Sequence, residues 1–379
     1  MKFVFIGLIG IIAADIYIWY AYIRKKGLLL KILHWIPLIG LFFSIAIVMN
    51  DMAWWPTYIL TALILGFFLP KFVFAILTAL GNLSEKIFKH GQHIGLIAGL
   101  SAGLVLMSMN IYGLTFGWKR ITVKNITTEF YDLPESFDGF RIIHLSDMHI
   151  GTYSKSPQTV KKIVDTVNGL KPDLILFTGD MINMSPDEFF PFISEISKLK
   201  AKAGVYSVLG NHDYCGYARY STQNGQKDAV TRLIGMEREA GMNLLMNENR
   251  IIHNGCDSIA LIGVENDGLP PFPERGDLMK AQKGLPDGIF KILMSHDPTH
   301  WHRKVLPDTD IDLTLSGHTH AMQLKIGNFS PSMFVYPEWG GLYTDGARLL
   351  YVSTGTGGNI AFRWGAWPEI DVITLKKRK

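Results

Sequence analysis

The sequence predicts a two-part protein in which about four transmembrane helices precede an α/β domain. The first observation is length, because 379 residues exceed one ordinary domain. The second is an uneven distribution of apolar residues: residues 1–117 hold nearly all the long apolar runs, whereas residues 118–379 have ordinary globular composition. The third is a repeated pattern in the second part, where an apolar strand ends in a short loop that carries Asp, Asn or His. We therefore predict a transmembrane region over residues 1–117 and a catalytic domain over residues 118–379.

Four apolar runs in the first part are long enough to cross a bilayer, at roughly residues 3–23, 32–49, 54–80 and 94–116. A cleaved signal peptide is the alternative for the first run, but that run is long, lacks a small-x-small cleavage site and precedes further apolar runs. Pro70 lies in the third run, where we expect a helix to end or kink. We expect the lone acid of the first run, Asp15, at a solvated or interfacial position. We expect no charge cluster that resembles an ion path within the runs, which argues against a transporter.

The basic residues of the short loops predict the orientation, because cytoplasmic loops are enriched in Lys and Arg. The first and third connections are basic, with Arg24, Lys25, Lys26, Lys31, Lys86 and Lys89. The second connection, around Asn50 and Asp51, has no positive charge. This alternation predicts a multi-pass protein of the cell (inner) membrane with an extracytoplasmic catalytic domain. Three basic residues after the last run oppose that orientation: Lys119, Arg120 and Lys124.

The net charge and the cysteine content argue against a nucleic-acid-binding protein and against a structural zinc site. The net charge of +4 is small, so no nucleic-acid partner is expected, and no feature predicts a protein partner. Cys215 and Cys256 lie outside any C-x-x-C motif, so a structural zinc site is not supported. The two cysteines either pair outside the cytoplasm or remain free thiols, and free thiols are the preferred interpretation.

The second part alternates predicted strands and helices. Residues 121–131 alternate apolar and polar, as an entry strand does. Buried strands are predicted for the apolar run that ends at Leu145 and for residues 173–178, 205–209, 290–294, 311–315, 348–353 and 369–375. Helical spacing occurs at residues 159–170, 189–199 and 231–240. The dipeptide Asn254-Gly255 between two short runs predicts a β-hairpin.

Polar residues follow five of these strands: Asp147, His149, Asp180, Asn211, His212, His296, His318 and His320. Ligands of α/β sheets bind outside the carboxyl ends of strands, so we expect these side chains at one edge. Carboxylates, an amide and imidazoles without a thiolate suit Mn, Fe or Zn. The set is too large for one tetrahedral ion, so we predict two divalent ions with one bridging carboxylate. Such a pair lowers the pKa of a shared water and holds the oxygens of a phosphate ester during attack.

The order of these motifs resembles the calcineurin-like metallophosphoesterase superfamily over residues 140–325. The motifs are Asp-x-His at 147–149, Gly-Asp at 179–180, Gly-Asn-His-Asp at 210–213, His296 and Gly-His-Thr-His at 317–320. Residues 133–139 and Arg363 with Pro368-Glu369 are similar to the membrane-anchored bacterial branch. One departure is Met322, a bulky residue where that branch usually has a small one. The resemblance implies a four-layer α-β-β-α sandwich after the transmembrane helices.

The resemblance also implies a role for each motif residue. Asp147, His149 and His320 would hold one ion, and Asn211, His296 and His318 the second, with Asp180 as the bridge. His212 would hydrogen-bond the phosphate and protonate the leaving oxygen. Arg363 is a candidate phosphate contact, because a guanidinium suits bidentate phosphate binding. Asp213 is expected to cap a turn or support His212, and His144 to be a core histidine.

The implied activity is that of a membrane-anchored phosphohydrolase or phosphodiesterase in which a metal-activated hydroxide attacks phosphorus. The membrane anchor points to a membrane-associated lipid or glycolipid as substrate. One alternative is a pyrophosphate hydrolase of the UDP-2,3-diacylglucosamine type in lipid A synthesis, which needs a cytoplasmic site. An alternative of another class is a membrane scaffold or sensor with a structural metal site.

Overall fold

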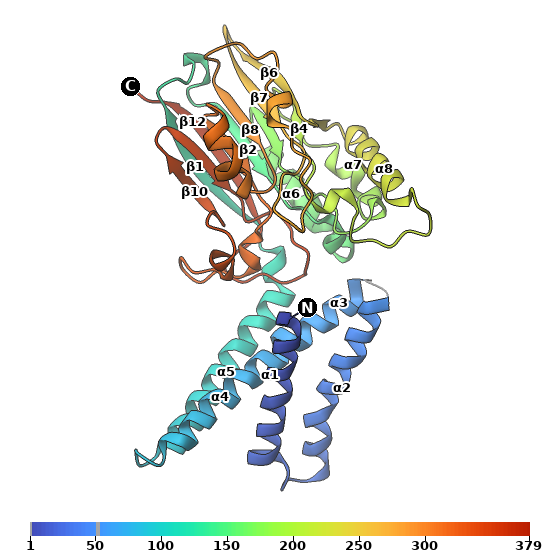
Figure 1. The fold of residues 1–379 in the computed structure, drawn as a ribbon, viewed down its shortest axis with the longest axis vertical. Coiled ribbons are helices and arrows are strands. Elements are labelled where there is room, and N and C mark those ends of the chain that lie inside the picture. Colours follow the sequence, from blue (N-terminus) through green and yellow to red (C-terminus); the bar gives the residue numbers. More distant parts are fainter. Residues whose placement is uncertain (1, 51–53) are drawn as a thin grey trace. The chain divides into compact units, whose positions relative to one another are not determined.

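The computed structural model describes residues 2–50 and 54–379 (Figure 1). The chain divides into two compact units. Unit 1 comprises Met1–Gly117 with Ile360–Phe362, and unit 2 comprises Trp118–Asn359 with Arg363–Lys379.

Unit 1 is helical throughout its described elements. These are α1 (Lys2–Ile18) with the π-helix η1 (Trp19–Ile23), α2 (Leu28–Asn50), α3 (Trp54–Leu63), the π-helix η2 (Ile64–Phe68), α4 (Leu69–Ser84) and α5 (Gly91–Thr115). Three helical spans of the described residues are long and apolar enough to cross a bilayer: Leu28–Val48, Thr57–Ser84 and Gly91–Lys119. A shorter apolar helix covers Gly7–Ile23. The predicted second connection falls partly on residue 51, which lies outside the described residues.

The third apolar run changes from α-helix to π-helix before Pro70. The π-helix η2 separates α3 from α4, and Pro70 occupies the first turn of α4. Proline suits a first turn, because its missing N–H would have no intrahelical partner there. Helix α4 then packs closely on α5, since a Cβ placed on Gly81 or Gly95 would meet the backbone of the other. Small residues allow this close approach between membrane helices.

A buried ion pair corrects the prediction for Asp15. Asp15 of α1 is fully buried and forms an ion pair with Lys71 of α4. The His34 Nε2 lies 3.2 Å from the Asp15 carbonyl oxygen, and the Lys71 ammonium lies 4.9 Å from the centre of the Phe67 ring. The expectation of a solvated or interfacial Asp15 is therefore wrong, whereas a single ion pair does not form an ion path. The residue that pairs with Asp15 lies two apolar runs later, so inspection of the first run alone could not find it.

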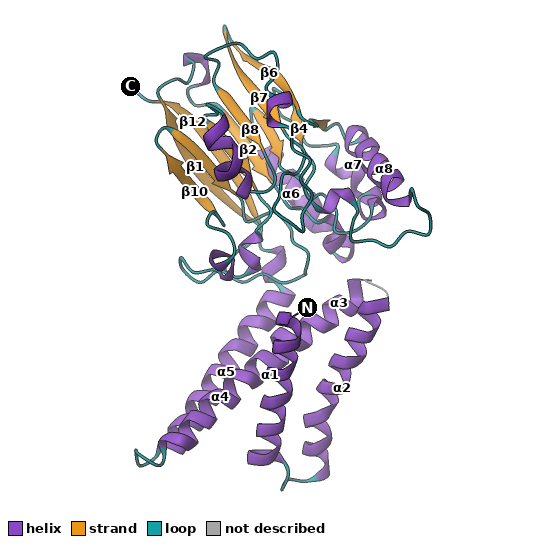
Figure 2. Ribbon diagram, viewed as in Figure 1, coloured by secondary structure: helices purple, strands orange, loops and turns teal. Residues whose placement is uncertain are grey.

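Unit 2 contains two six-stranded sheets (Figure 2). The first has the order β1 (Thr122–Phe130), β12 (Glu369–Lys377), β2 (Arg141–Leu145), β3 (Leu174–Phe177), β4 (Val205–Ser207) and β5 (Asn243–Leu244). The second has the order β10 (Gly341–Asp345), β11 (Arg348–Val352), β9 (Leu313–Ser316), β8 (Lys291–Met294), β7 (Asp257–Gly263) and β6 (Glu248–Asn254). Both sheets mix parallel and antiparallel pairs.

The main core lies between the inner faces of the two sheets. Ile142 and Leu176 of the first sheet and Ile292 and Leu315 of the second belong to one cluster of fully buried side chains. Helices α6 (Pro157–Gly169), α7 (Ile193–Ile196) and α8 (Gly225–Glu239) lie together on one side of the sheets (Figure 2). Helix α9 (Leu278–Ala281) contacts β6 of the second sheet, and α10 (Leu306–Asp308) precedes β9. The predicted two-sheet α/β architecture after apolar helices is confirmed.

The boundaries of several elements differ from the predictions. The segment predicted as a helix at residues 189–199 forms a 3₁₀ turn, Phe190–Phe192, and the single turn of α7, because Pro191 cannot continue a helix from the preceding residues. Helix α8 begins at Gly225, earlier than predicted. The short strands β5 and β10 were not predicted, since neither contains a continuous apolar run.

Candidate metal centre

The polar loops of both sheets meet at one edge. Asp147 and His149 follow β2, Asp180 follows β3, and Asn211 and His212 follow β4. The second sheet adds three imidazoles, from His296 after β8 and from His318 and His320 after β9. Strands β2, β3 and β4 are parallel to one another, as are β8 and β9, so their carboxyl ends coincide. The structure thus gathers all eight predicted residues.

One set of metal-donor atoms comes from Asp147, His149, Asp180 and His320, which lie within 4.8 Å of one another. The Nε2 atoms of His149 and His320 are 3.2 Å apart, and the His320 Nε2 is 3.3 Å from Asp147 Oδ1. All four residues are buried. Lone pairs of neutral imidazoles and carboxylates therefore converge on one small volume without a cationic side chain of Lys or Arg among them.

A second set shares one member with the first. Asp180, His296 and His318 also place donor atoms within 4.8 Å of one another. Asn211 joins them, because its Oδ1 lies 2.8 Å from His318 Nδ1 and 3.2 Å from His296 Nε2. Asp180 belongs to both sets, which is the position that a bridging carboxylate requires. Two carboxylates, one amide and four imidazoles fit two divalent cations, and they do not single out one metal.

The backbone at this edge is unusually strained. Asp147, His149, Asp180, His318 and His320 all have positive φ angles, between 43° and 73°. Non-glycine residues in such conformations cost on the order of 1–3 kcal/mol each, and they concentrate at functional sites. Five such residues in one cluster indicate that the fold sacrifices local stability to aim these side chains inward.

Burial controls the charge of the imidazoles. It lowers the pKa of His318 to about 4 and the pKa values of His149 and His320 well below their usual range. These rings are therefore neutral near pH 7 and keep a lone pair for a cation. Burial also disfavours charge on His296, but the Asp180 carboxylate, 3.2 Å from its Nε2, acts together with Asp147 and the Thr178 carbonyl to raise the pKa of His296 to about 10. A proton on His296 thus compensates part of the negative charge of these carboxylates.

Asp213 supports the loops from behind. Its carboxylate accepts hydrogen bonds from the backbone N–H groups of Asp180 at 2.7 Å, Met181 at 2.9 Å and Gly210 at 2.9 Å. It therefore holds two ligand-bearing loops in one arrangement and does not join either donor set. His144 is fully buried and its Nε2 lies 2.8 Å from Thr178 Oγ1, as a core histidine would.

His212 lies beside the donor sets without belonging to them. Its Nδ1 is 2.6 Å from the Asn183 carbonyl oxygen, so this nitrogen donates, and Nε2 lies 3.4 Å from Asn359 Nδ2. The ring stacks on Tyr217 with centroids 4.3 Å apart. The sequence did not predict Asn183, Asn359 and Tyr217 as neighbours of His212, because each comes from a loop whose path a short motif does not reveal.

Arg363 differs from its expected role. It is only 1% exposed, and its guanidinium donates to the carbonyl oxygens of Gly357, Thr354 and Ala366. The backbone N–H of Gly357 in turn donates to the carbonyl of Asp147 at 2.8 Å. The guanidinium is therefore engaged by backbone carbonyls, which assigns Arg363 to holding the loop beside Asp147 instead of contacting phosphate.

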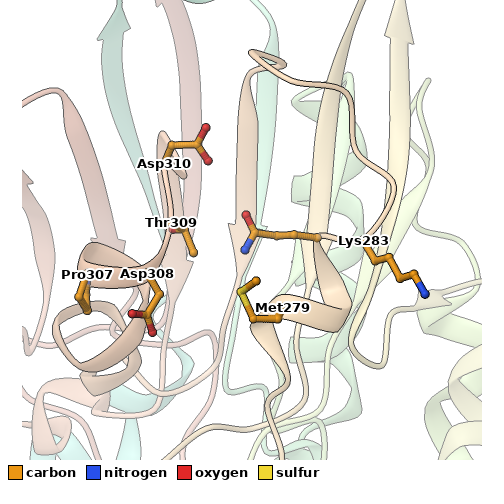
Figure 3. Close-up of a pocket in the computed structure, with 7 residues that line it drawn as sticks. Met279, Lys283, Pro307, Asp308, Thr309 and Asp310 are labelled. Atoms are coloured by element: carbon orange, nitrogen blue, oxygen red, sulfur yellow. The ribbon is translucent and has the colours of Figure 1, made fainter.

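A separate hollow in unit 2 lies away from these residues. Figure 3 shows Met279, Lys283 and residues 307–310 around it, and Gln282 completes the lining. Among the described residues, its lining includes no imidazole and no member of either donor set. We assign it no part in the chemistry of the metal centre.

Comparison with known proteins agrees with this chemistry. Residues 140–322 match the family model described as calcineurin-like phosphoesterase. The chain is 32% identical over 256 residues to the uncharacterized metallophosphoesterase YkuE of Bacillus subtilis, which covers 64% of this chain and 82% of that protein. The chain belongs to the calcineurin-like phosphoesterase family. The His/Asp cluster is thus the metal site of a metallophosphoesterase domain.

Other relatives of this metallophosphoesterase come from animals and bacteria. A transmembrane protein with metallophosphoesterase domain from Danio rerio is 30% identical over 332 residues, covering 83% of this chain and 71% of that protein. The UDP-2,3-diacylglucosamine pyrophosphatase LpxG of Chlamydia trachomatis is 25% identical over 321 residues, covering 68% of this chain and 92% of that protein. The candidate membrane spans and the transmembrane relative indicate a membrane protein, and the family resemblance is not limited to bacteria.

Proposed function

We propose that the protein is a membrane-anchored, metal-dependent phosphohydrolase that cleaves a phosphate monoester or diester. The observation that carries the proposal is the pair of buried donor sets that share Asp180. Asp147, His149 and His320 would hold one divalent ion, Asn211, His296 and His318 the other, and Asp180 both. Two such ions supply an activated water and stabilise the charge that develops on the phosphate oxygens.

His212 supplies the proton in this proposal. Its Nδ1–H donates to the Asn183 carbonyl, which fixes the ring and leaves Nε2 as the second proton-carrying position. When the P–O bond to the leaving group breaks, Nε2 gives its proton to the leaving oxygen and the imidazole becomes neutral. The stacking of the ring on Tyr217 limits its rotation, so the proton is held in one direction.

Substitution of Asp180 tests the proposal. The purified full chain with added Mn²⁺ should hydrolyse an aryl phosphate ester. Asp180→Asn should abolish this activity and lower bound metal, measured by elemental analysis, from about two ions towards one or none, because the bridge loses its charge. Asp187→Asn is the matched control, since Asp187 is exposed and forms an ion pair with the exposed Arg232. Full metal occupancy and activity in Asp180→Asn would refute the bridging role.

The membrane anchor supports a more specific proposal, that the substrate is a membrane-associated lipid or glycolipid. A second candidate is the pyrophosphate bond of UDP-2,3-diacylglucosamine, favoured by the similarity to LpxG over 92% of that protein. We also propose that the chain belongs to the membrane-anchored bacterial branch of the family, a proposal supported by residues 133–139 and by Arg363 with Pro368-Glu369. A metal site used only as a structural element is less favoured, because every motif residue is present.

The charge pattern of the loops supports an extracytoplasmic catalytic domain. A topology reporter fused after Lys379 should then be active only outside the cytoplasm. An inward result would reverse the orientation and favour the UDP-2,3-diacylglucosamine candidate, which needs a cytoplasmic site. Lys119, Arg120 and Lys124 would in that case be the residues that determine the orientation.

A further inference from the structure

The segment after the last metal-donor histidine exposes many large apolar side chains. Six of them, all at least 43% exposed, are Met322, Ile326, Phe329, Met333, Phe334 and Val335. Phe334 is 78% exposed. Apolar side chains grouped on a soluble surface, instead of scattered singly, mark a site of interaction. We call residues 326–335 the apolar loop.

The apolar loop is fixed to the metal centre on its inner side. Ser330 Oγ donates to the carbonyl of Ala321 at 2.6 Å, directly after His320. The Tyr336 hydroxyl, just beyond the loop, lies 3.0 Å from His318 Nε2. The position of the loop therefore follows from the position of the donor histidines, while its large side chains point to solvent.

Strand directions place the apolar loop at the edge where the chain enters unit 2. Strand β1 is parallel to β12, with Thr122 opposite Glu369, and β12 is antiparallel to β2, with Asp371 opposite His144. Strand β1 therefore begins at the edge where β2 ends and the donor residues lie. Trp118, at the entry to unit 2, lies three residues after the end of α5 and near the end of the last candidate membrane span, Gly91–Lys119.

Side-chain contacts within unit 2 connect the entry point with the apolar loop. The Arg120 guanidinium lies 4.8 Å from the centre of the Trp367 ring, and that ring is 5.8 Å from Trp364. The Trp364 carbonyl accepts a hydrogen bond from the Lys325 amide at 2.8 Å, and Lys325 immediately precedes the loop. In Figure 1 the segment around residues 320–340 lies at the end of unit 2 opposite the C-terminus.

We propose that the apolar loop docks into the surface of a phospholipid bilayer and holds the metal-centre edge of unit 2 against it. We infer a bilayer as the partner for two reasons. Strand β1 starts at this edge shortly after a candidate membrane helix, and the residues at this edge are of the types found at membrane–water interfaces. Lys119, Arg120 and Lys325 supply positive charge for anionic headgroups, and tryptophans stand among them. A surface for a second copy of the chain would not need this basic, tryptophan-rich border.

Docking favours phosphate esters carried by membrane lipids over dissolved phosphate esters. An ester carried by a membrane lipid would meet the donor residues without leaving the bilayer surface, whereas a dissolved ester gains nothing from the loop. This consequence rests on the proposed hydrolase function, but the docking itself does not.

Fluorescence quenching in nanodiscs tests the docking without reference to activity. The full chain with Cys256→Ser and Phe334→Cys is labelled with an environment-sensitive dye, since the remaining Cys215 is buried. Lipids with a nitroxide on the acyl chain quench a dye inserted about 5–10 Å into the interface. We expect strong quenching at position 334. The matched control is Tyr131→Cys, which is 57% exposed and follows β1 at the opposite edge, and it should show several-fold less quenching.

A second labelled variant separates docking from mere proximity to the membrane. A dye at Ile326→Cys should be quenched in the native loop and lose most of that quenching when Met333, Phe334 and Val335 are all replaced by Ser. Equal quenching at positions 334 and 131 would overturn the proposal. So would quenching at position 326 that survives the triple Ser replacement. Hydrolysis of a soluble aryl phosphate by each variant reports separately on the fold and on the proposed function.

Discussion

His212 differs from the other imidazoles of the metal centre in what its nitrogens face. One nitrogen is held by the Asn183 carbonyl, and the other lies 3.4 Å from Asn359 Nδ2 and belongs to neither donor set. His212→Ala should therefore leave bound metal near the wild-type level and lower kcat by about 10²–10⁴-fold, the usual contribution of a general acid. The loss should be greatest for esters with poor leaving groups, measured as kcat across a series of aryl and alkyl phosphates.

The control for this variant is His253→Ala, because His253 is exposed on β6. Loss of metal from His212→Ala would make His212 a ligand. An equal loss of kcat for good and poor leaving groups would mean that His212 positions the phosphate and does not donate the proton.

Glu237 makes the free energy of unfolding depend on pH. Its carboxyl is fully buried and accepts a hydrogen bond from Ser207 Oγ at 2.7 Å. Burial, with the nearby Asp213, raises the pKa of Glu237 from 4.5 to about 8. An acid with a higher pKa in the folded state takes up a proton on folding, so its contribution is present below pH 4.5 and is lost as the pH rises to about 8.

Glu237→Gln removes this titration. The thermal midpoint of the variant relative to wild type should therefore rise between about pH 4.5 and about pH 8 and stay level at higher pH. Glu239→Gln is the control, since Glu239 is exposed on the same helix. A difference between Glu237→Gln and wild type that does not change with pH would show that Glu237 ionises normally in the folded protein.

The sequence identified the donor residues better than the residues that orient them. Asp147 and His318 stand in short motifs at strand ends, so their position at one sheet edge follows from parallel strands. Tyr217 contacts His212 and Asn211 through its own side chain, and Arg363 holds the backbone of a loop; no short motif encodes either arrangement. Arg363 was noticed for its charge, but its role depends on three carbonyls that the sequence does not reveal.

At the scale of elements, the loop held by Arg363 is expected to determine metal affinity. Arg363→Lys keeps the positive charge but loses the planar fork that reaches Gly357, Thr354 and Ala366. Residues that orient metal ligands typically change metal affinity by about 10–100-fold when replaced. The variant should therefore need more metal for half-maximal activity, while the KM for an aryl phosphate at saturating metal stays near wild type. A raised KM with unchanged metal affinity would restore the phosphate-contact role.

Elements with a buried apolar run were predictable, and short or edge elements were not. Strand β3 is continuous and buried on both faces, so its composition alone identifies it. Strand β10 is a partly exposed edge strand that forms by pairing with β11, an event outside its own sequence. The single turn of α7 similarly depends on packing and not on its helical propensity.

At the scale of the whole molecule, metal should stabilise the fold. The donor sets bury two carboxylates and strained backbone, so ions that bind only the folded state raise stability. Free metal at about 100 times its Kd adds about 2.7 kcal/mol for one site. A chelator should lower the thermal midpoint of the wild type, and added Mn²⁺ should restore it. Asp180→Asn should respond far less, and an equal response would place the stabilising metal elsewhere.

The contrast between the apolar residues 1–117 and the ordinary composition of residues 118–379 predicted that membrane helices precede an α/β domain. It could not predict which helices of unit 1 contact one another, because contacts between membrane helices depend on small residues and single polar groups. Gly81 opposite Gly95 and Asp15 opposite Lys71 are examples, and each joins residues from different apolar runs.

The ion pair of Asp15 and Lys71 has a consequence for how the protein is made. During synthesis α1 leaves the ribosome first, and its Asp15 has no partner until α4 follows. A lone acid at the centre of a membrane helix costs about 2.5–3.5 kcal/mol during insertion. We therefore expect stable insertion of α1 to depend on α4, because α4 supplies Lys71 as the partner of Asp15. A nascent chain that ends before residue 71 would present an acid-bearing helix that the membrane retains poorly.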